Sequence, residues 1–171
     1  QAVLLESISL LPDPALRAQF QSFAPAATAA SMPAPVRRAA IAALPLTSPE
    51  HVAENFAVLA ELVQQGQFDQ QAARAAMQLP RTAWDRTKAQ AVVESILEYA
   101  KTVPAIQRTE QNYVEVTQFG TELCSLLPAD TGAKLRKSLG EAGRAWSRRN
   151  SWLQSANMLF NPSPPSPHPH R

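Results

Sequence analysis

Apolar residues recur every three or four positions along most of this chain, and prolines separate one run from the next. The clearest run follows Ser-Pro-Glu at residues 48–50, carries Phe56, Leu59 and Leu62 on one side, and stops near Gly66. Serine and proline are typical of a helix start, and glycine of a helix end. The spacing predicts an amphipathic helix that packs through one face.

The other runs predict further helices with short connections. Asp13 and Asp69 can cap the helices after them, because an aspartate accepts a hydrogen bond from an N–H of the first turn. Prolines close most runs, and Gly140 or Gly143 can cap the last one. The first run is apolar enough to be buried. The predicted helices cover residues 3–11, 14–23, 35–44, 49–66, 69–79, 87–102, 109–127 and 130–139, with a linker at 24–34.

About eight helices with short connections are typical of an α-solenoid or an irregular helical bundle. A faint repeat favours the solenoid. Leu44-Pro45 and Leu79-Pro80 are 35 residues apart, and each follows an alanine-rich helix that contains arginine. This period fits arrays built of helix pairs. We therefore predict an all-α fold, either a right-handed helical array or an irregular bundle.

The composition agrees with an all-α fold. Alanine, leucine, glutamine and glutamate are abundant, and 45% of the 171 residues are apolar, which is enough for one domain with a sizeable core. No run is long enough to span a membrane, and no window has the pattern of a signal peptide. The chain opens at Gln1 without methionine, which suggests a piece of a longer or processed protein.

The distribution of charged residues divides the chain into a slightly acidic helical body and a basic C-terminal end. The net charge is +2, but the four arginines after residue 143 have no acid beside them, so the rest sums to 12 − 14 = −2. Such a body lacks the basic face that nucleic acids require. We expect a helical-repeat domain at 1–143 (N-terminal helices and linker 1–34, core 35–143), a basic tryptophan-containing extension at 144–160, and a disordered proline/histidine tail at 161–171.

The extension at 144–160 has two interpretations. Trp146 and Trp152 lie among Arg144, Arg148 and Arg149, and arginines with aromatic residues can bind nucleic acid or an anionic surface. Alternatively, the tryptophans pack on the helical body and the arginines keep their charges in water. We favour packing, so no nucleic-acid partner is expected.

The histidines have no ligand spacing. His51, with Glu50 and Glu54, is typical of a solvated helix face, and no second histidine follows on that face. His168 and His170 lie in the tail, where nothing would fix the geometry of a bound metal ion. We therefore predict no metal site.

Other candidate chemistry is equally sparse. The lone Cys124 lies on the apolar side of its helix and excludes an internal disulfide, so we predict a small buried hydrophobe. Glu94 and Glu98 are four residues apart on a helix and are typical of a solvated face, whereas acid–base catalysis would need a desolvated cleft. We assign no catalytic or cofactor-binding residue.

Short segments between about Arg38 and Gly143 resemble a known family. They are residues 56–63, 78–80 with Trp84, 97–99, 103–104, 108–109, 125–128, and 139–141 with Gly143. In this order they resemble the HEAT-like helical region of membrane-bound dehydrogenase proteins of planctomycetes and verrucomicrobia. Proteins of that family carry a haem-binding domain and often a plastocyanin-like copper domain.

The resemblance implies a HEAT-like spacer in a periplasmic or extracytoplasmic redox protein, with neighbouring haem, dehydrogenase or copper domains as partners. The chain lacks Cys-x-x-Cys-His and the histidine, cysteine and methionine set of a copper site, so no cofactor is expected here. We predict a non-catalytic scaffold, not an enzyme. Two alternatives stay open: a redox component that shapes a cofactor site supplied by another domain, and nucleic-acid or anionic-surface binding through the arginine/tryptophan end.

Overall fold

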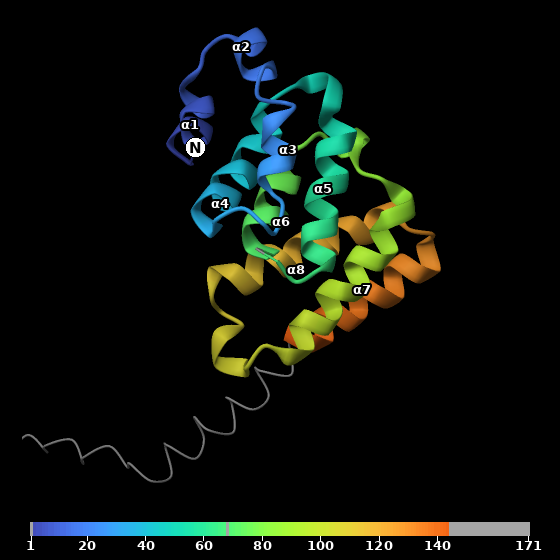
Figure 1. Ribbon diagram of the computed structural model, residues 1–171. Coiled ribbons are helices and arrows are strands. Elements are labelled where there is room, and N and C mark those ends of the chain that lie inside the picture. The colour runs from blue at the N-terminus through green and yellow to red at the C-terminus, as the bar shows by residue number, and fades with distance from the viewer. Residues whose placement is uncertain (1, 68, 144–171) are drawn as a thin grey trace, which may run out of the picture.

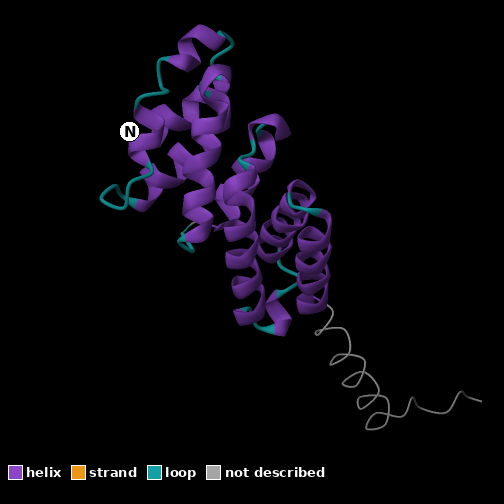
Figure 2. Cartoon of the chain, turned by 90° about the vertical axis from the view of Figure 1, so that its right-hand side faces the viewer, coloured by secondary structure: helices purple, strands orange, loops and turns teal. Residues whose placement is uncertain are grey.

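The computed structural model describes residues 2–67 and 69–143, and every regular element within them is an α-helix or a 3-10 turn. Figures 1 and 2 show the helices stacked from an N-terminal end, which holds α1 and α2, to an opposite end formed by α7, α8 and the last described helical turns. The predicted all-α class is confirmed.

Three short helices form the N-terminal end. Asp13 caps the second of them as predicted, because its carboxylate accepts the Ala15 N–H at 2.8 Å. The helices are α1 (Ala2–Glu6), which continues as a 3-10 turn (Ser7–Leu10), α2 (Pro14–Ala18) and α3 (Phe23–Ala27).

Two predictions were wrong in this region. The helix expected at 14–23 ends at Ala18, and the expected linker at 24–34 begins inside α3. Pro25 lies in the first turn of α3, where a residue needs no intrahelical N–H bond, so proline does not prevent this helix. Ala24 is fully buried in α3, which packs against α4.

The longer helices follow and match the predicted runs closely. Ser48 Oγ accepts the Glu50 N–H at 3.3 Å in the turn before α5, and Asp85 caps α7 by accepting the Thr87 N–H at 2.8 Å. The helices are α4 (Ala34–Ala43), α5 (Val52–Gln64), α6 (Asp69–Gln78), α7 (Arg86–Thr102) and α8 (Gln111–Leu123), and residues 129–143 are also helical.

The last helical segment runs further than expected. It was predicted to cover residues 130–139 with Gly140 or Gly143 as its cap, and it continues through Gly140 to residue 143. A glycine inside a helix costs only about 1 kcal/mol relative to alanine. The Arg108 side chain donates to the Ala142 carbonyl at 2.5 Å, so one of the last carbonyls has a partner.

The longer helices lie in two layers. In one layer α6 packs against both α4 and α8, and in the other α5 packs against α7. Contacts of α5 with α6 and of α7 with α8 join the layers. The repeated Leu44 and Leu79 are both buried, and each directly follows a helix of the first layer. This alternation is what an array of helix pairs requires. Its handedness and the HEAT-like assignment stay predictions.

An aromatic cluster joins the layers at the centre of the core. It consists of Phe56 from α5, Trp84 from the turn before α7, and Phe119 from α8. The Trp84 ring lies 5.8 Å from Phe56 and 5.5 Å from Phe119 between centroids, stacked on the first and edge-on to the second. Both arrangements are favourable for aromatic quadrupoles. Trp84, which was noted only for the family resemblance, therefore has a packing role.

A buried polar cluster attaches the N-terminal end to this array. Asn55 of α5 is fully buried, and its amide nitrogen donates to the Leu44 carbonyl at 2.9 Å and to Thr47 Oγ1 at 3.2 Å. The Asn55 oxygen accepts the side-chain N–H of Gln21 at 3.0 Å. Loss of these hydrogen bonds would leave Asn55 buried without a partner, which costs about 1–3 kcal/mol of folding stability. The bonds therefore hold the turn after α2 against α5.

Candidate functional site

The described histidine has only one acidic partner. His51 Nδ1 lies 2.8 Å from Glu54 Oε2, and both side chains are largely exposed. Within residues 2–67 and 69–143, no three His, Cys, Asp or Glu side chains come close enough to hold a metal ion. His168 and His170 lie outside the described residues.

The thiol and the carboxylate pair singled out above lie in very different surroundings. Cys124 is buried as predicted, and burial raises the pKa of its thiol, which makes it a poor nucleophile at neutral pH. Glu94 accepts a hydrogen bond from Gln90 at 2.9 Å, and Glu98 pairs with Lys101 at 2.7 Å, all on an exposed face. Neither glutamate lies in a desolvated cleft.

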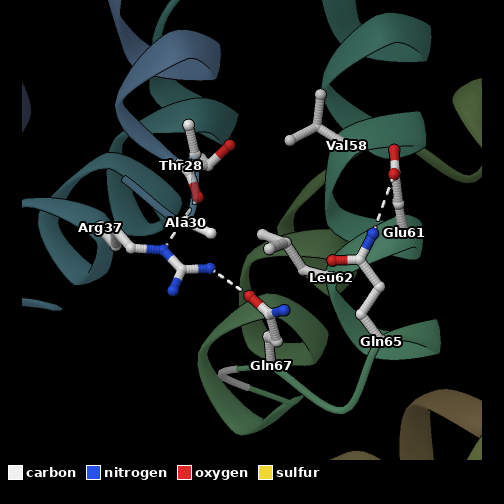
Figure 3. Close-up of a pocket in the computed structure, with 9 residues that line it drawn as sticks. Thr28, Ala30, Arg37, Val58, Glu61, Leu62, Gln65 and Gln67 are labelled. Carbon is white, nitrogen blue, oxygen red and sulfur yellow. Dashed lines mark hydrogen bonds between the residues drawn. The ribbon is translucent and has the colours of Figure 1, made fainter. Parts of the chain in front are cut away.

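A cavity of about 290 Å³ lies between the loop after α3, α4 and α5 (Figure 3). The Arg37 guanidinium donates to the Thr28 carbonyl at 2.9 Å and to Gln67 Oε1. On the α5 side, Gln65 donates to Glu61 at 2.9 Å. Arg37 thus links the loop before α4 to the turn before α6. No nucleophile with an adjacent base is found among the described residues that line this cavity.

A second cavity, of about 490 Å³, lies where the turn between α5 and α6 meets α7. Asp69 lines it. Asp69 was predicted to cap α6, but it is the first residue of that helix. The Asp69 Oδ1 atom is buried without a partner among the described residues. Burial raises the pKa of this carboxyl group. The cavity holds no histidine, cysteine or second carboxylate among its described lining, so it supports neither a metal site nor an acid–base pair.

The N-terminal end exposes large apolar side chains, which we call the N-terminal apolar face: Val3, Leu10 and Leu16. Their exposed fractions are 73%, 80% and 42%. Leu5 and Ile8 of the same segment are buried, and α1 packs against α4. The first run is therefore buried on one side only, which corrects the prediction of a buried helix. Exposed apolar side chains at the terminal unit of a helical array make that end a candidate interaction site.

The opposite end has a groove of about 420 Å³, the C-terminal groove, between α8 and residues 129–143. Tyr113, Val114 and Thr117 line it from α8, and Leu139 and Gly143 line it from the last helical segment. Tyr113 is 6% exposed, and its hydroxyl has no hydrogen-bond partner among the described residues. Burial raises the pKa of this hydroxyl, so it is neutral and can donate or accept.

No family model, curated protein or solved structure matches the chain. The resemblance to the dehydrogenase-associated HEAT-like region therefore stays a prediction. In the part of the chain that the structure describes, no helix has both the length and the apolar content needed to cross a membrane.

The remaining predictions about chemistry concern the C-terminal end. The arginine/tryptophan extension at 144–160 and the tail at 161–171 lie outside the described residues. Tyr113 was expected on the apolar stripe of its helix and is buried there, whereas the half-exposed Val114 was not singled out from the sequence. For the N-terminal end, the apolar run at residues 3–11 did not show that Val3 and Leu10 would be exposed while Leu5 and Ile8 are buried.

Proposed function

We propose that this chain is a non-catalytic helical scaffold that binds a neighbouring protein domain through the N-terminal apolar face. The observation that carries the proposal is the exposure of Val3, Leu10 and Leu16 at one end of a stacked array. Helical arrays need a polar outer face on a terminal unit to stay soluble, and an apolar end calls for a covering neighbour.

Charge supports an apolar partner surface at this end. Residues 2–12 contain Glu6 as their only charged side chain, so an approaching domain would desolvate few charges. Ile106 is equally exposed, at 79%, but it stands in the turn after α7 beside Gln107 and Arg108. An isolated exposed apolar residue of this kind is ordinary and gives no reason to expect a partner.

The identity of the partner rests on the resemblance alone. The resemblance suggests that the partner is a haem-, dehydrogenase- or copper-bearing domain of the same extracytoplasmic polypeptide or complex. On this proposal, any redox cofactor belongs to that domain. The purified chain should therefore show no absorbance of haem, flavin or copper, and a stoichiometric cofactor spectrum would contradict the proposal.

Site-specific photo-crosslinking in the cells that make the protein tests the surface. A photoreactive amino acid at position 10 should form an adduct with one defined protein, because this position lies at the proposed interface. The matched control is position 106, where a side chain of the same exposure should give no such adduct. Equal adducts at both positions, or none at position 10, would contradict the proposed face.

A further inference from the structure

The cavity where the turn after α5 meets α7 contains a carboxylate that lacks a positive partner. Asp69 lines this cavity, and its Oδ1 atom is buried without a hydrogen bond among the described residues. No lysine, arginine or histidine occurs among the described residues that line the cavity. A buried carboxylate without a partner is unfavourable, so an occupant that brings a positive charge and N–H donors is favoured.

The Asp69 carboxylate can turn its unpaired oxygen toward such an occupant. The torsion that rotates a carboxylate is broad and roughly two-fold, so its two oxygens exchange places at little cost. Burial raises the pKa of this carboxyl group, whereas a cation bound beside it would favour the ionised form. Binding of a cation and ionisation of Asp69 therefore support each other.

The rest of the lining narrows the class of cation. Val63, Ile96 and Val116 contribute buried apolar side chains, and Tyr99 contributes an aromatic ring. These groups suit an organic cation, because apolar surface contacts its carbon atoms and an aromatic face attracts its charge. A single carboxylate is too few for a metal ion, which takes several oxygen ligands. One carboxylate also balances one positive charge, so a monoamine fits better than a diamine.

The position and size of the cavity agree with this class of ligand. Val63 and Gln64 belong to the last turn of α5, and the C-terminus of a helix carries a partial negative charge. Ser95 of α7 donates to the Gln64 carbonyl at 3.2 Å, so its hydroxyl oxygen can still accept an N–H. The volume of about 490 Å³ lies within the range of small-molecule sites.

We propose that this cavity binds a small organic monoamine, with the ammonium group at the Asp69 carboxylate and the apolar part against Tyr99 and Ile96. The site shares no residue with the N-terminal apolar face, so the inference does not depend on the proposed function.

Titration of the full chain with phenethylammonium, a monoamine with an apolar ring, tests the site. Methyl NMR of the isoleucine-labelled chain locates the ligand without any substitution. The Ile96 signal should shift and saturate, whereas Ile8, Ile41 and Ile106, which are not among the described lining, should not shift. Phenethyl alcohol has the same shape without the charge. It should bind at least about tenfold more weakly, because it loses the charge-assisted bonds to the carboxylate.

A matched pair of variants assigns the charge. Asp69→Asn should weaken the binding of phenethylammonium at least about tenfold. Glu98→Gln removes the same charge from an exposed position on α7 and should bind like the parent. Urea denaturation checks that both variants fold. If Asp69→Asn does not fold, the comparison of amine and alcohol at Ile96 in the parent still decides.

Three results would overturn the inference: an Ile96 signal that ignores the amine, equal affinities for amine and alcohol, or an unchanged affinity in folded Asp69→Asn. A capped lysine, with its amino and carboxyl groups blocked, separates a free amine from a lysine side chain of another protein. We expect it to bind more weakly than phenethylammonium, because it lacks the ring. Equal or tighter binding of the capped lysine would contradict a free monoamine as the ligand.

Discussion

Two glycines set the distance between the last helices of the array. A Cβ on Gly132 would lie 2.3 Å from the Cys124 carbonyl oxygen, so only a residue without a side chain lets the turn after α8 cross the next helix here. A Cβ on Gly120 would lie 3.1 Å from the Ile96 side chain and 3.3 Å from Leu139. The Ile96 and Leu139 side chains can move slightly to make room for a Cβ at Gly120. The Cys124 carbonyl cannot move away from Gly132 without disturbing the turn after α8.

Gly132→Ala should therefore destabilise the protein, although alanine is the better helix former by about 1 kcal/mol. We expect a loss of about 1–3 kcal/mol in the free energy of unfolding, the usual cost of overpacking, measured by urea denaturation. Gly143→Ala is the control, because a Cβ there would make only an ordinary contact. It should leave the stability unchanged or raise it by up to about 1 kcal/mol, because alanine is the better helix former. An alanine variant at 132 as stable as the parent would contradict this packing.

At the scale of elements, two ion pairs join the first layer of helices. Arg74 of α6 lies 2.7 Å from Glu115 of α8, and Arg81, in the turn after α6, pairs with Glu122. The hydrogen bond from Arg74 is the main cause that lowers the pKa of Glu115, and Gln111 and Gln70 add to it. A lowered pKa in the folded state means that ionised Glu115 stabilises the fold above its unfolded pKa, and that this contribution is lost as the pH falls.

Glu115→Gln should accordingly cost less than about 1 kcal/mol at neutral pH, since the arginine is half exposed and such pairs are screened by water. The stability difference from the parent should shrink as the pH falls from the ordinary glutamate pKa through the lowered pKa of Glu115 in the folded protein. Denaturation curves over this range measure it. Glu98→Gln, which removes an exposed pair with Lys101, is the control and should differ little throughout. A stability difference between Glu115→Gln and the parent that persists or grows in acid would contradict a lowered pKa of Glu115.

A helix of this protein is predictable from the sequence where its hydrophobic spacing and its start or stop residues indicate the same boundaries. α5 and α7 were found because each has a long amphipathic stripe next to a clear boundary signal, Ser48-Pro49 before α5 and Pro104 after α7. α3 was missed because Ala24 is buried by packing against α4, which is a tertiary contact. The extension of the last helix to residue 143 was missed because Arg108, a distant residue in the sequence, bonds to the Ala142 carbonyl. For the same reason the sequence could not show that Gly132 touches Cys124, or that α8 and residues 129–143 form a groove.

At the scale of the whole molecule, the two ends of the array differ. One end exposes Val3, Leu10 and Leu16, and the other has the C-terminal groove between α8 and residues 129–143. Between them the described residues form a packed core that contains a buried thiol and a buried polar cluster around Asn55. This distribution is consistent with the proposed scaffold.

The affinity for the domain captured at position 10 is the strictest test of the proposed scaffold. That domain, once purified, is titrated by calorimetry against the parent chain, Leu10→Glu and Ile106→Glu, whose substituted side chains have nearly the same exposure. Burying a leucine contributes about 1.5–3 kcal/mol, and 1.4 kcal/mol is a tenfold change in affinity, so Leu10→Glu should weaken binding at least about tenfold. Ile106→Glu should bind like the parent. Equal affinities of the parent and Leu10→Glu would contradict the proposed scaffold.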